Sequence, residues 1–140
     1  MPPPSDNAPD AASYGQPRLT EKQLDKLCYG RVIYAHLRKH GSPVIEPHYG
    51  IILNTNDQIK KIRLKSNPTY AVICVSNRPD SKFLLAPPAR TFLKGRIQGE
   101  WQTDVEEAGI LKIGPQLTVL EMIPIHELIR QVDEAKKSTQ

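Results

Sequence analysis

The sequence lacks the features that mark membrane proteins, secreted proteins and several enzyme classes. Its apolar runs are far shorter than the roughly 18 residues that a membrane span needs. Its start lacks the charged-then-apolar pattern of a secretory signal, so we expect a cytoplasmic protein. It contains no glycine-rich phosphate loop, no Gly-x-Ser-x-Gly motif and no close cluster of metal-ligating residues. We therefore expect no cofactor and no bound metal.

Cysteine is also scarce. The chain has two cysteines, Cys28 and Cys74, which lie far apart in the sequence. A metal pair would need more ligands at closer spacing, and Cys74 falls in a stretch that we predict to be buried. We therefore predict two reduced thiols with a structural role rather than a disulfide.

Length and composition indicate one globular domain. At 140 residues, with 39% apolar and 24% charged residues, the chain is long enough to form one sizeable core. Residues 1–18 contain five prolines and almost no large apolar side chains, so we predict a disordered proline-rich arm there. We predict a single domain over residues 19–136 and a frayed tail over residues 137–140, within a polar end that starts at residue 134.

Positive charge is concentrated in the middle of the chain. Residues 30–117 hold thirteen Lys and Arg residues against seven Asp and Glu residues, a net charge of +6, whereas the whole chain carries +4. A basic domain suits an anionic partner such as RNA or DNA. A protein with a slightly basic surface and no nucleic-acid partner has the same composition, so charge alone does not decide between the two.

The stretch Tyr70–Asn77 predicts a central strand. Residues 71–75 are all apolar and are followed by a Ser-Asn-Arg-Pro turn signal. Such a run is too short for a helix and is typical of a strand that is buried on both faces. Further short strands are predicted over residues 30–37, 48–53, 83–85, 91–93, 96–98 and 100–105. Short strands separated by Pro, Gly and Asn turns predict a mainly β fold, a small β-barrel rather than a parallel α/β sheet.

Helices are predicted at both ends of the domain. Residues 19–28 begin with Thr20 and Gln23 at the spacing of a capping box. In the C-terminal helix Pro124 suits the first turn, and apolar residues follow at helical spacing: Ile125, Leu128, Ile129 and Val132. Residues 59–65 include alternating apolar and basic side chains, which predict either an exposed edge strand or a basic loop.

The order of these motifs resembles that of a known family. The motifs are two early strands, a central strand, a Thr-x-Leu element, a late tryptophan, and a closing turn and helix. In this chain they are Gly30–Ala35, Tyr49–Leu53, Ala71–Ser76, Thr91-Phe92-Leu93, Trp101, and Gly114 with Leu117, Leu120 and Ile123. Over about residues 30–132 the chain thus resembles the PemK/MazF-type toxins, in which the Thr-x-Leu element is Thr-Gly-Leu.

This resemblance implies both a fold and an activity. The fold would be an SH3-like β-barrel that forms a homodimer. The activity would be that of the toxin in a toxin–antitoxin system. Such a toxin is a metal-independent endoribonuclease that cleaves single-stranded RNA and is neutralised by a cognate antitoxin protein.

The chain departs from the family at the residues that carry the chemistry. The family commonly has an Arg-Pro pair at the start of its second strand, where this chain has His48-Tyr49. A Thr usually follows the family's central strand, and the nearest match here is Ser76, with Val75 as the alternative register. The family's reaction is attack of the RNA 2′-hydroxyl on the neighbouring phosphate, which requires proton transfer. The resemblance therefore predicts His48 and Ser76 as the catalytic residues.

Four more polar residues are predicted to bind RNA. Asn77 would bind a phosphate oxygen, and Arg38, Lys39 and Arg78 would neutralise its charge. The turn around residues 38–40 also has a purely structural interpretation, as a solvated loop.

The other candidates have structural interpretations as well. A single histidine at a strand start, such as His48, is often a surface residue, and Ser76 can cap a strand end. We interpret Trp101 as part of the core rather than as a base-stacking surface, because it lies in a stretch with alternating polarity.

Three functions are compatible with the sequence. The first is a ribonuclease toxin in which His48 and Ser76 replace the usual pair. The second is a catalytically inactive SH3-like barrel that binds nucleic acid or a protein. The third is a structural or interaction protein whose basic surface is incidental. We favour the first.

Overall fold

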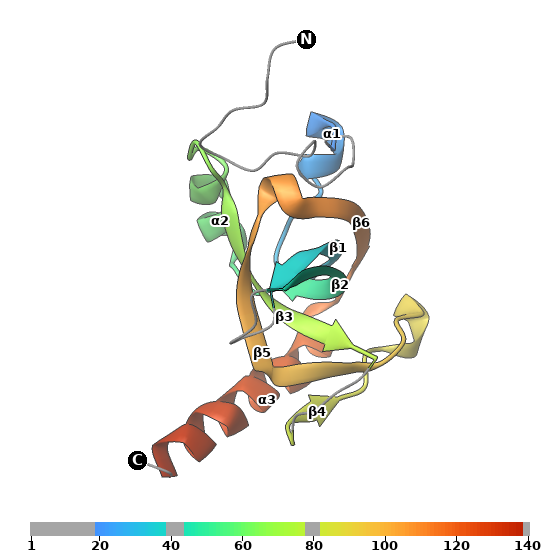
Figure 1. Ribbon diagram of the computed structural model, residues 1–140, viewed down its shortest axis with the longest axis vertical. Coiled ribbons are helices and arrows are strands. Elements are labelled where there is room, and N and C mark those ends of the chain that lie inside the picture. The colour runs from blue at the N-terminus through green and yellow to red at the C-terminus, as the bar shows by residue number, and fades with distance from the viewer. Residues whose placement is uncertain (1–18, 39–43, 78–81, 139–140) are drawn as a thin grey trace.

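The computed structural model describes residues 19–38, 44–77 and 82–138 (Figure 1). Within these residues, six strands form one antiparallel sheet in the order β4-β5-β3-β2-β1-β6. The strands are β1 (Arg31–Arg38), β2 (Ile45–Ile52), β3 (Thr69–Ser76), β4 (Leu84–Leu85), β5 (Arg96–Glu106) and β6 (Ile110–Gln116). The helical segments are α1 (Glu21–Leu24), α2 (Asn56–Ile62), α3 (Val119–Ser138) and the short 3-10 turns η2 (Ala89–Thr91) and η3 (Glu107–Gly109). The fold is therefore mainly β with a C-terminal helix, as predicted.

β3 lies in the middle of this sheet, between β5 and β2. Its side chains alternate between the two faces, as the pleat of a strand requires. Tyr70, Val72 and Cys74 belong to one hydrophobic cluster, and Ile73 and Val75 belong to another. The prediction of a central strand buried on both faces is confirmed.

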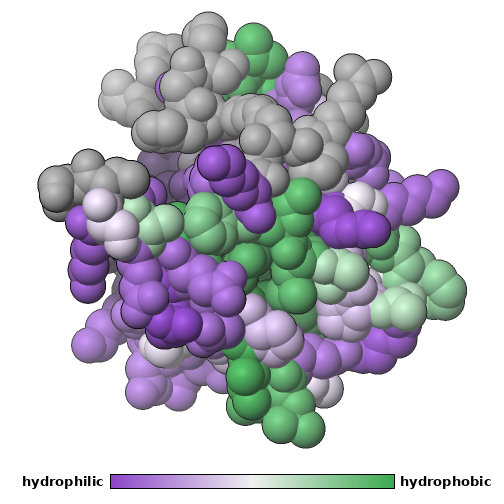
Figure 2. All heavy atoms as spheres, turned by 90° about the horizontal axis from the view of Figure 1, so that it is seen from below, coloured by the Kyte–Doolittle hydropathy of each residue, from purple (hydrophilic) through white to green (hydrophobic). Residues whose placement is uncertain are grey.

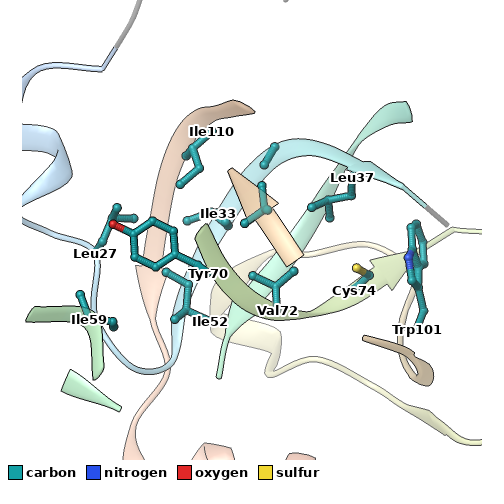
Figure 3. Packing of buried hydrophobic residues seen from close by; sticks show 12 residues of the cluster. Leu27, Ile33, Leu37, Ile52, Ile59, Tyr70, Val72, Cys74, Trp101 and Ile110 are labelled. Carbon is teal, nitrogen blue, oxygen red and sulfur yellow. The ribbon is translucent and has the colours of Figure 1, made fainter. Parts of the chain in front are cut away.

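One of these clusters, here called the inner cluster, lies inside the curl of the sheet. Figure 1 shows β5 and β6 arching around β1 and β2. Figure 3 shows the inner cluster as a row of side chains from Leu27 and Ile59 at one end to Trp101 at the other. Its buried members are Leu27, Ile33, Ala35, Leu37, Ile52, Ile59, Tyr70, Val72, Cys74, Trp101, Val105 and Ile110.

The other cluster, here called the helix-side cluster, joins the opposite face of the sheet to α3. Its buried members are Val32, Ile51, Ile73, Val75, Ile97, Leu117, Met122, Ile125 and Leu128. The apolar residues at helical spacing near the C-terminus therefore cover the sheet. In Figure 1, α3 runs below the sheet toward the C-terminus.

Two further predictions about the core are confirmed. Cys28 and Cys74 are free thiols, and burial raises the pKa of Cys74, which keeps it protonated. Trp101 is buried, and its indole N–H donates a hydrogen bond to the carbonyl oxygen of Arg38 at 3.1 Å. No helix in the described ranges is long and apolar enough to cross a membrane.

α1 begins with the capping box that the sequence predicts. The backbone N–H of Gln23 donates to Thr20 Oγ1 at 3.2 Å, and the backbone N–H of Thr20 donates to Gln23 Oε1 at 2.8 Å. The helix ends at Leu24, so it is shorter than the predicted range of 19–28.

The prediction of an edge strand or loop at residues 59–65 is wrong, because α2 occupies residues 56–62. The helix has its own capping box, in which the backbone N–H of Gln58 donates to Thr55 Oγ1 at 3.2 Å and the backbone N–H of Thr55 donates to Gln58 Oε1 at 2.9 Å. Ile59 is buried and Ile62 packs beside it against the inner cluster, a spacing of three that suits a helix.

Two of the predicted short strands are joined in the structure. Residues 96–98 and 100–105 form the single strand β5, which pairs with both β3 and β4. Residues 91–93 form no strand, because η2 ends there and Phe92 adopts a left-handed conformation with φ of 56°. A left-handed residue breaks the extended geometry of a strand.

α3 is longer at both ends than the sequence predicts. It begins at Val119, where Thr118 Oγ1 accepts from the backbone N–H of Glu121 at 3.1 Å, so Pro124 lies inside the helix rather than in its first turn. At the other end, residues 134–138 continue the helix instead of fraying. The predicted arm at residues 1–18 and the last two residues of the predicted tail lie outside the described residues.

A matched pair of isoleucines on α3 tests the helix-side cluster. Ile125 is fully buried, whereas Ile123 is 57% exposed on the same helix. We expect Ile125→Ala to lower the free energy of unfolding by about 2–5 kcal/mol, because it leaves a cavity. Ile123→Ala should change it by less than about 0.5 kcal/mol. Urea unfolding measures both, and equal effects would contradict the packing described here.

Candidate active site

A cavity of about 770 Å³ lies where β2 and β3 separate. β2 pairs with β1 over residues 45–51, but it pairs with β3 only over residues 49–52. The first half of β2 therefore extends beyond the end of β3 and opens a space beside it. The cavity is lined by Tyr34, Leu37, Val44, Glu46, Pro47, His48, Tyr49, Val75, Ser76, Asn77, Phe92, Lys94 and Trp101.

This cavity brings together three of the six residues predicted from the sequence. His48, Ser76 and Asn77 all line it. Tyr49 and Val75 form the last cross-strand pair of β2 and β3, so His48 and Ser76 are the next residues on their two strands. Residues that are distant in the sequence thus meet at the point where the strands diverge.

The other three predicted residues are not placed in the cavity. Arg38 is exposed at the end of β1 and is not among the lining residues. Its backbone carbonyl instead holds the Trp101 indole. Lys39 and Arg78 lie outside the described residues.

His48 lies beside an indole and a carboxylate. Its ring meets Trp101 edge-on, with 4.9 Å between ring centroids and 76° between ring planes. Its Nε2 atom lies 3.6 Å from Glu46 Oε2. This distance brings the two groups close but is longer than a hydrogen bond. His48 therefore lies at the cavity wall beside Trp101, the residue at one end of the inner cluster in Figure 3.

A glycine brings the loop after η2 against the end of β3. Gly95 has φ of 94°, and a Cβ atom on it would lie 2.3 Å from the carbonyl oxygen of Ser76. Only glycine tolerates both this conformation and this approach. The close contact places the neighbouring Lys94 and Phe92 on the cavity beside Ser76.

The same loop is tied to the start of α3. Arg90 Nε donates to Glu121 Oε2 at 2.9 Å, and Arg90 Nη2 donates to the carbonyl oxygen of Gln116, also at 2.9 Å. The hydrogen bonds from Arg90 lower the pKa of the Glu121 carboxyl to about 2. Thr91 Oγ1 donates to the carbonyl oxygen of Pro88 at 2.6 Å. The position of the loop is thus fixed from two sides.

The sequence did not identify several cavity residues: Glu46, Tyr49, Phe92 and Lys94. Three of them carry no local signal, because a single charge or aromatic residue near a strand end is common. Phe92 does carry one, since it stands where the PemK/MazF-type pattern has the glycine of Thr-Gly-Leu.

The arrangement suits proton transfer next to an anion. The imidazole of His48 has nitrogen atoms that can donate or accept a proton. The Ser76 hydroxyl, the Asn77 amide and the Lys94 ammonium can interact with phosphate oxygens. In the part of the chain that the structure describes, no three His, Cys, Asp or Glu residues form a group that could hold a metal ion.

Comparisons with known proteins support the fold but offer no relative in sequence. No protein-family model matches the chain, and no curated protein has significant sequence similarity to it. Its structure is similar to that of MazF from Deinococcus radiodurans, with a TM-score of 0.59 and 8% identity over 76% of this chain and 94% of that one. It is also similar to a mycobacterial endoribonuclease solved with its cognate antitoxin, with a TM-score of 0.55 and 12% identity over 75% of this chain and 90% of that one.

Gly95→Ala tests whether the loop and the site depend on this contact. We expect the variant to lose about 1–3 kcal/mol of stability from the unfavourable backbone conformation alone. The added methyl group should also displace Ser76. Lys94→Ala is the control, because Lys94 is an exposed neighbour and its loss should leave stability unchanged. Urea unfolding gives the comparison, and equal stability of both variants would contradict the contact.

The Arg90–Glu121 pair predicts a specific acid dependence. A carboxyl whose pKa is lowered in the folded state adds stability above its unfolded pKa, here near 4.5, and loses it as the pH falls toward about 2. Glu121→Gln should therefore be less stable than the wild type at pH 6, and the difference should shrink between pH 4.5 and pH 2. Melting temperatures across this range measure it. A constant difference would show that Glu121 is not the titrating group.

The sheet order, the C-terminal helix and these likenesses confirm the resemblance at the level of the fold: the chain has a MazF-like fold, with low sequence identity to the solved examples.

Proposed function

We propose that the chain is the toxin of a toxin–antitoxin pair and a metal-independent endoribonuclease that cleaves single-stranded RNA in this cavity. The observation that carries the proposal is the meeting of His48, Ser76 and Lys94 around one cavity of a MazF-like fold. The cavity volume of about 770 Å³ is within the range of small-ligand sites and can hold a nucleotide unit.

The proposed reaction uses the nucleophile of the RNA itself. The 2′-hydroxyl attacks the adjacent phosphorus, the bond to the 5′-oxygen breaks, and a 2′,3′-cyclic phosphate and a 5′-hydroxyl are formed. In this proposal His48 accepts the proton of the 2′-hydroxyl and then delivers it to the leaving 5′-oxygen, with Glu46 3.6 Å from its Nε2 atom. Ser76, Asn77 and Lys94 bind the phosphate oxygens, where negative charge grows in the transition state.

In this proposal the remaining predicted residues, Arg38, Lys39 and Arg78, also bind the RNA. Arg38 lies at the end of β1, next in sequence to Leu37 of the cavity wall. Lys39 and Arg78, which lie outside the described residues, stay predictions from the sequence as RNA-binding residues. Two free thiols fit a reducing compartment, so we propose a cytoplasmic location.

The proposal also includes an SH3-like barrel, a homodimer and an antitoxin partner. The mycobacterial neighbour and a MazF neighbour from Deinococcus radiodurans were both solved as complexes with an antitoxin. Figure 2 views the molecule from the side of α3 and shows apolar side chains gathered across that face. The exposed large apolar residues of α3 are Val119, Leu120 and Ile123, which is a suitable composition for a protein contact.

A second candidate is a binding module without catalysis. It is favoured by Glu46, whose carboxylate lies in the cavity beside His48. A negative charge at this place repels a phosphate, which disfavours cleavage beside His48.

Cleavage of a long, mixed-sequence single-stranded RNA in excess EDTA separates the two candidates. We expect the wild type to cleave it, and His48→Ala to reduce the rate by about 10²–10⁴-fold, because the proton-transfer group is lost. Ser76→Ala should also slow the reaction. His126→Ala is the matched control, since His126 is hydrogen-bonded to Tyr29, and neither lines the cavity.

Two results would contradict parts of this proposal. Intact RNA at high protein concentration, together with salt-sensitive RNA binding, would contradict catalysis and leave the binding module. Cleavage that survives His48→Ala at full rate would remove His48 from the mechanism.

A further inference from the structure

Phe92 is an exposed aromatic residue in an unfavourable backbone conformation. Its side chain is 89% exposed, and its φ of 56° lies in the left-handed region. Among the described residues it is the one non-glycine residue with positive φ. For a bulky side chain this conformation is rare and costs folding free energy. An exposed apolar ring and a left-handed backbone conformation are both unfavourable for folding. A residue that combines them is often retained because it binds a ligand.

The exposure of Phe92 does not result from a loosely held loop. Thr91, just before it, is buried and donates a hydrogen bond to the Pro88 carbonyl oxygen. Arg90 is bound to Glu121 and Gln116 at the start of α3. The aromatic ring is therefore presented from a fixed position at the cavity.

The other aromatic residues of the cavity already have partners. Tyr34 and Tyr49 pack against each other with 4.8 Å between ring centroids, and the Lys112 ammonium lies 5.7 Å from the centroid of the Tyr34 ring. Trp101 is buried against His48. Within the described residues, Phe92 is the one cavity aromatic with no ring or cation contact. Its ring is therefore available to a ligand.

We propose that Phe92 stacks on a base of the bound single-stranded RNA, next to the phosphate held at Ser76 and Lys94. This inference rests on RNA being the ligand of the proposed site. Lys94, two residues from Phe92 on the same loop, lines the same cavity. An aromatic ring beside a cation matches the alternation of base and phosphate along a single strand. The net charge of +6 over residues 30–117 favours this ligand over an apolar protein segment.

A stacking role predicts opposite effects on binding and on stability. Phe92→Gly removes the ring and relieves the left-handed conformation, so it should weaken RNA binding without lowering the melting temperature. A residue kept for packing would show the reverse. This contrast distinguishes a binding role from a structural one.

The test measures binding of a fluorescent single-stranded RNA with 2′-fluoro substitutions, which lacks the nucleophile and is not cleaved. We expect Phe92→Ala and Phe92→Gly to bind about 5- to 100-fold more weakly than the wild type, the range that base stacking on an aromatic residue provides. Phe92→Trp should bind within about threefold of the wild type, because the indole is also a stacking surface. Leu64→Ala is the control, since Leu64 is 88% exposed and apolar but does not line the cavity.

Three results would overturn the inference. The first is equal RNA affinity of Phe92→Ala and the wild type, which would leave the ring to a protein partner. The second is full recovery by Phe92→Leu, which would indicate simple apolar contact. The third is absence of any RNA binding by the wild type, which overturns the proposed function as well. Wild-type binding without cleavage refutes the nuclease alone, so the two proposals fail separately.

Discussion

β3 contributes side chains to a hydrophobic cluster on each face of the sheet. The burial of both faces of this strand constrains the rest of the molecule. Tyr70, Val72 and Cys74 require the sheet to curl around them, and Ile73 and Val75 require a cover that α3 provides. The strand ends where its sequence turns polar, at Ser76. The candidate site lies at that end because β2 and β3 no longer pair beyond Tyr49 and Val75, although Ser76 still pairs with Arg96 of β5.

The same constraint explains which parts of the fold were predictable. An unbroken apolar run indicates a central strand whatever surrounds it, so β3 follows from the sequence. α2 does not, because the basic residues between Ile59 and Ile62 also fit an exposed edge strand. The capping pair Thr55 and Gln58 was the local signal that decides it. The union of two short strands into β5 depends on its pairing with β3 and β4, which no local pattern contains.

Those residues of the candidate site that lie at strand ends could be predicted from the sequence. His48 and Ser76 each follow from a strand boundary, and the register of β2 and β3 then brings them to one cavity. Lys94 and Phe92 reach it only because Gly95 allows its loop to touch the Ser76 backbone. Such a contact depends on three-dimensional packing. It could not be inferred from a glycine in a basic stretch.

A fold shared at 8–12% identity indicates that burial pattern, rather than residue identity, maintains this architecture. RNA cleavage would tolerate fewer substitutions than the fold does, because proton transfer and phosphate binding need particular groups at particular places. In this chain the His48 imidazole lies at the cavity wall near Glu46, and the Phe92 ring lies where the PemK/MazF-type pattern has glycine. Both departures concern the site rather than the core.

The most direct test of the central claim uses one RNA oligonucleotide that the wild type cleaves in EDTA and a copy of it with a single 2′-deoxyribose on the 5′ side of the cut. Attack by the RNA's own hydroxyl predicts that the first is cleaved to a 2′,3′-cyclic phosphate and that the copy stays intact at that bond. Cleavage of the 2′-deoxy copy at the same bond would contradict the account.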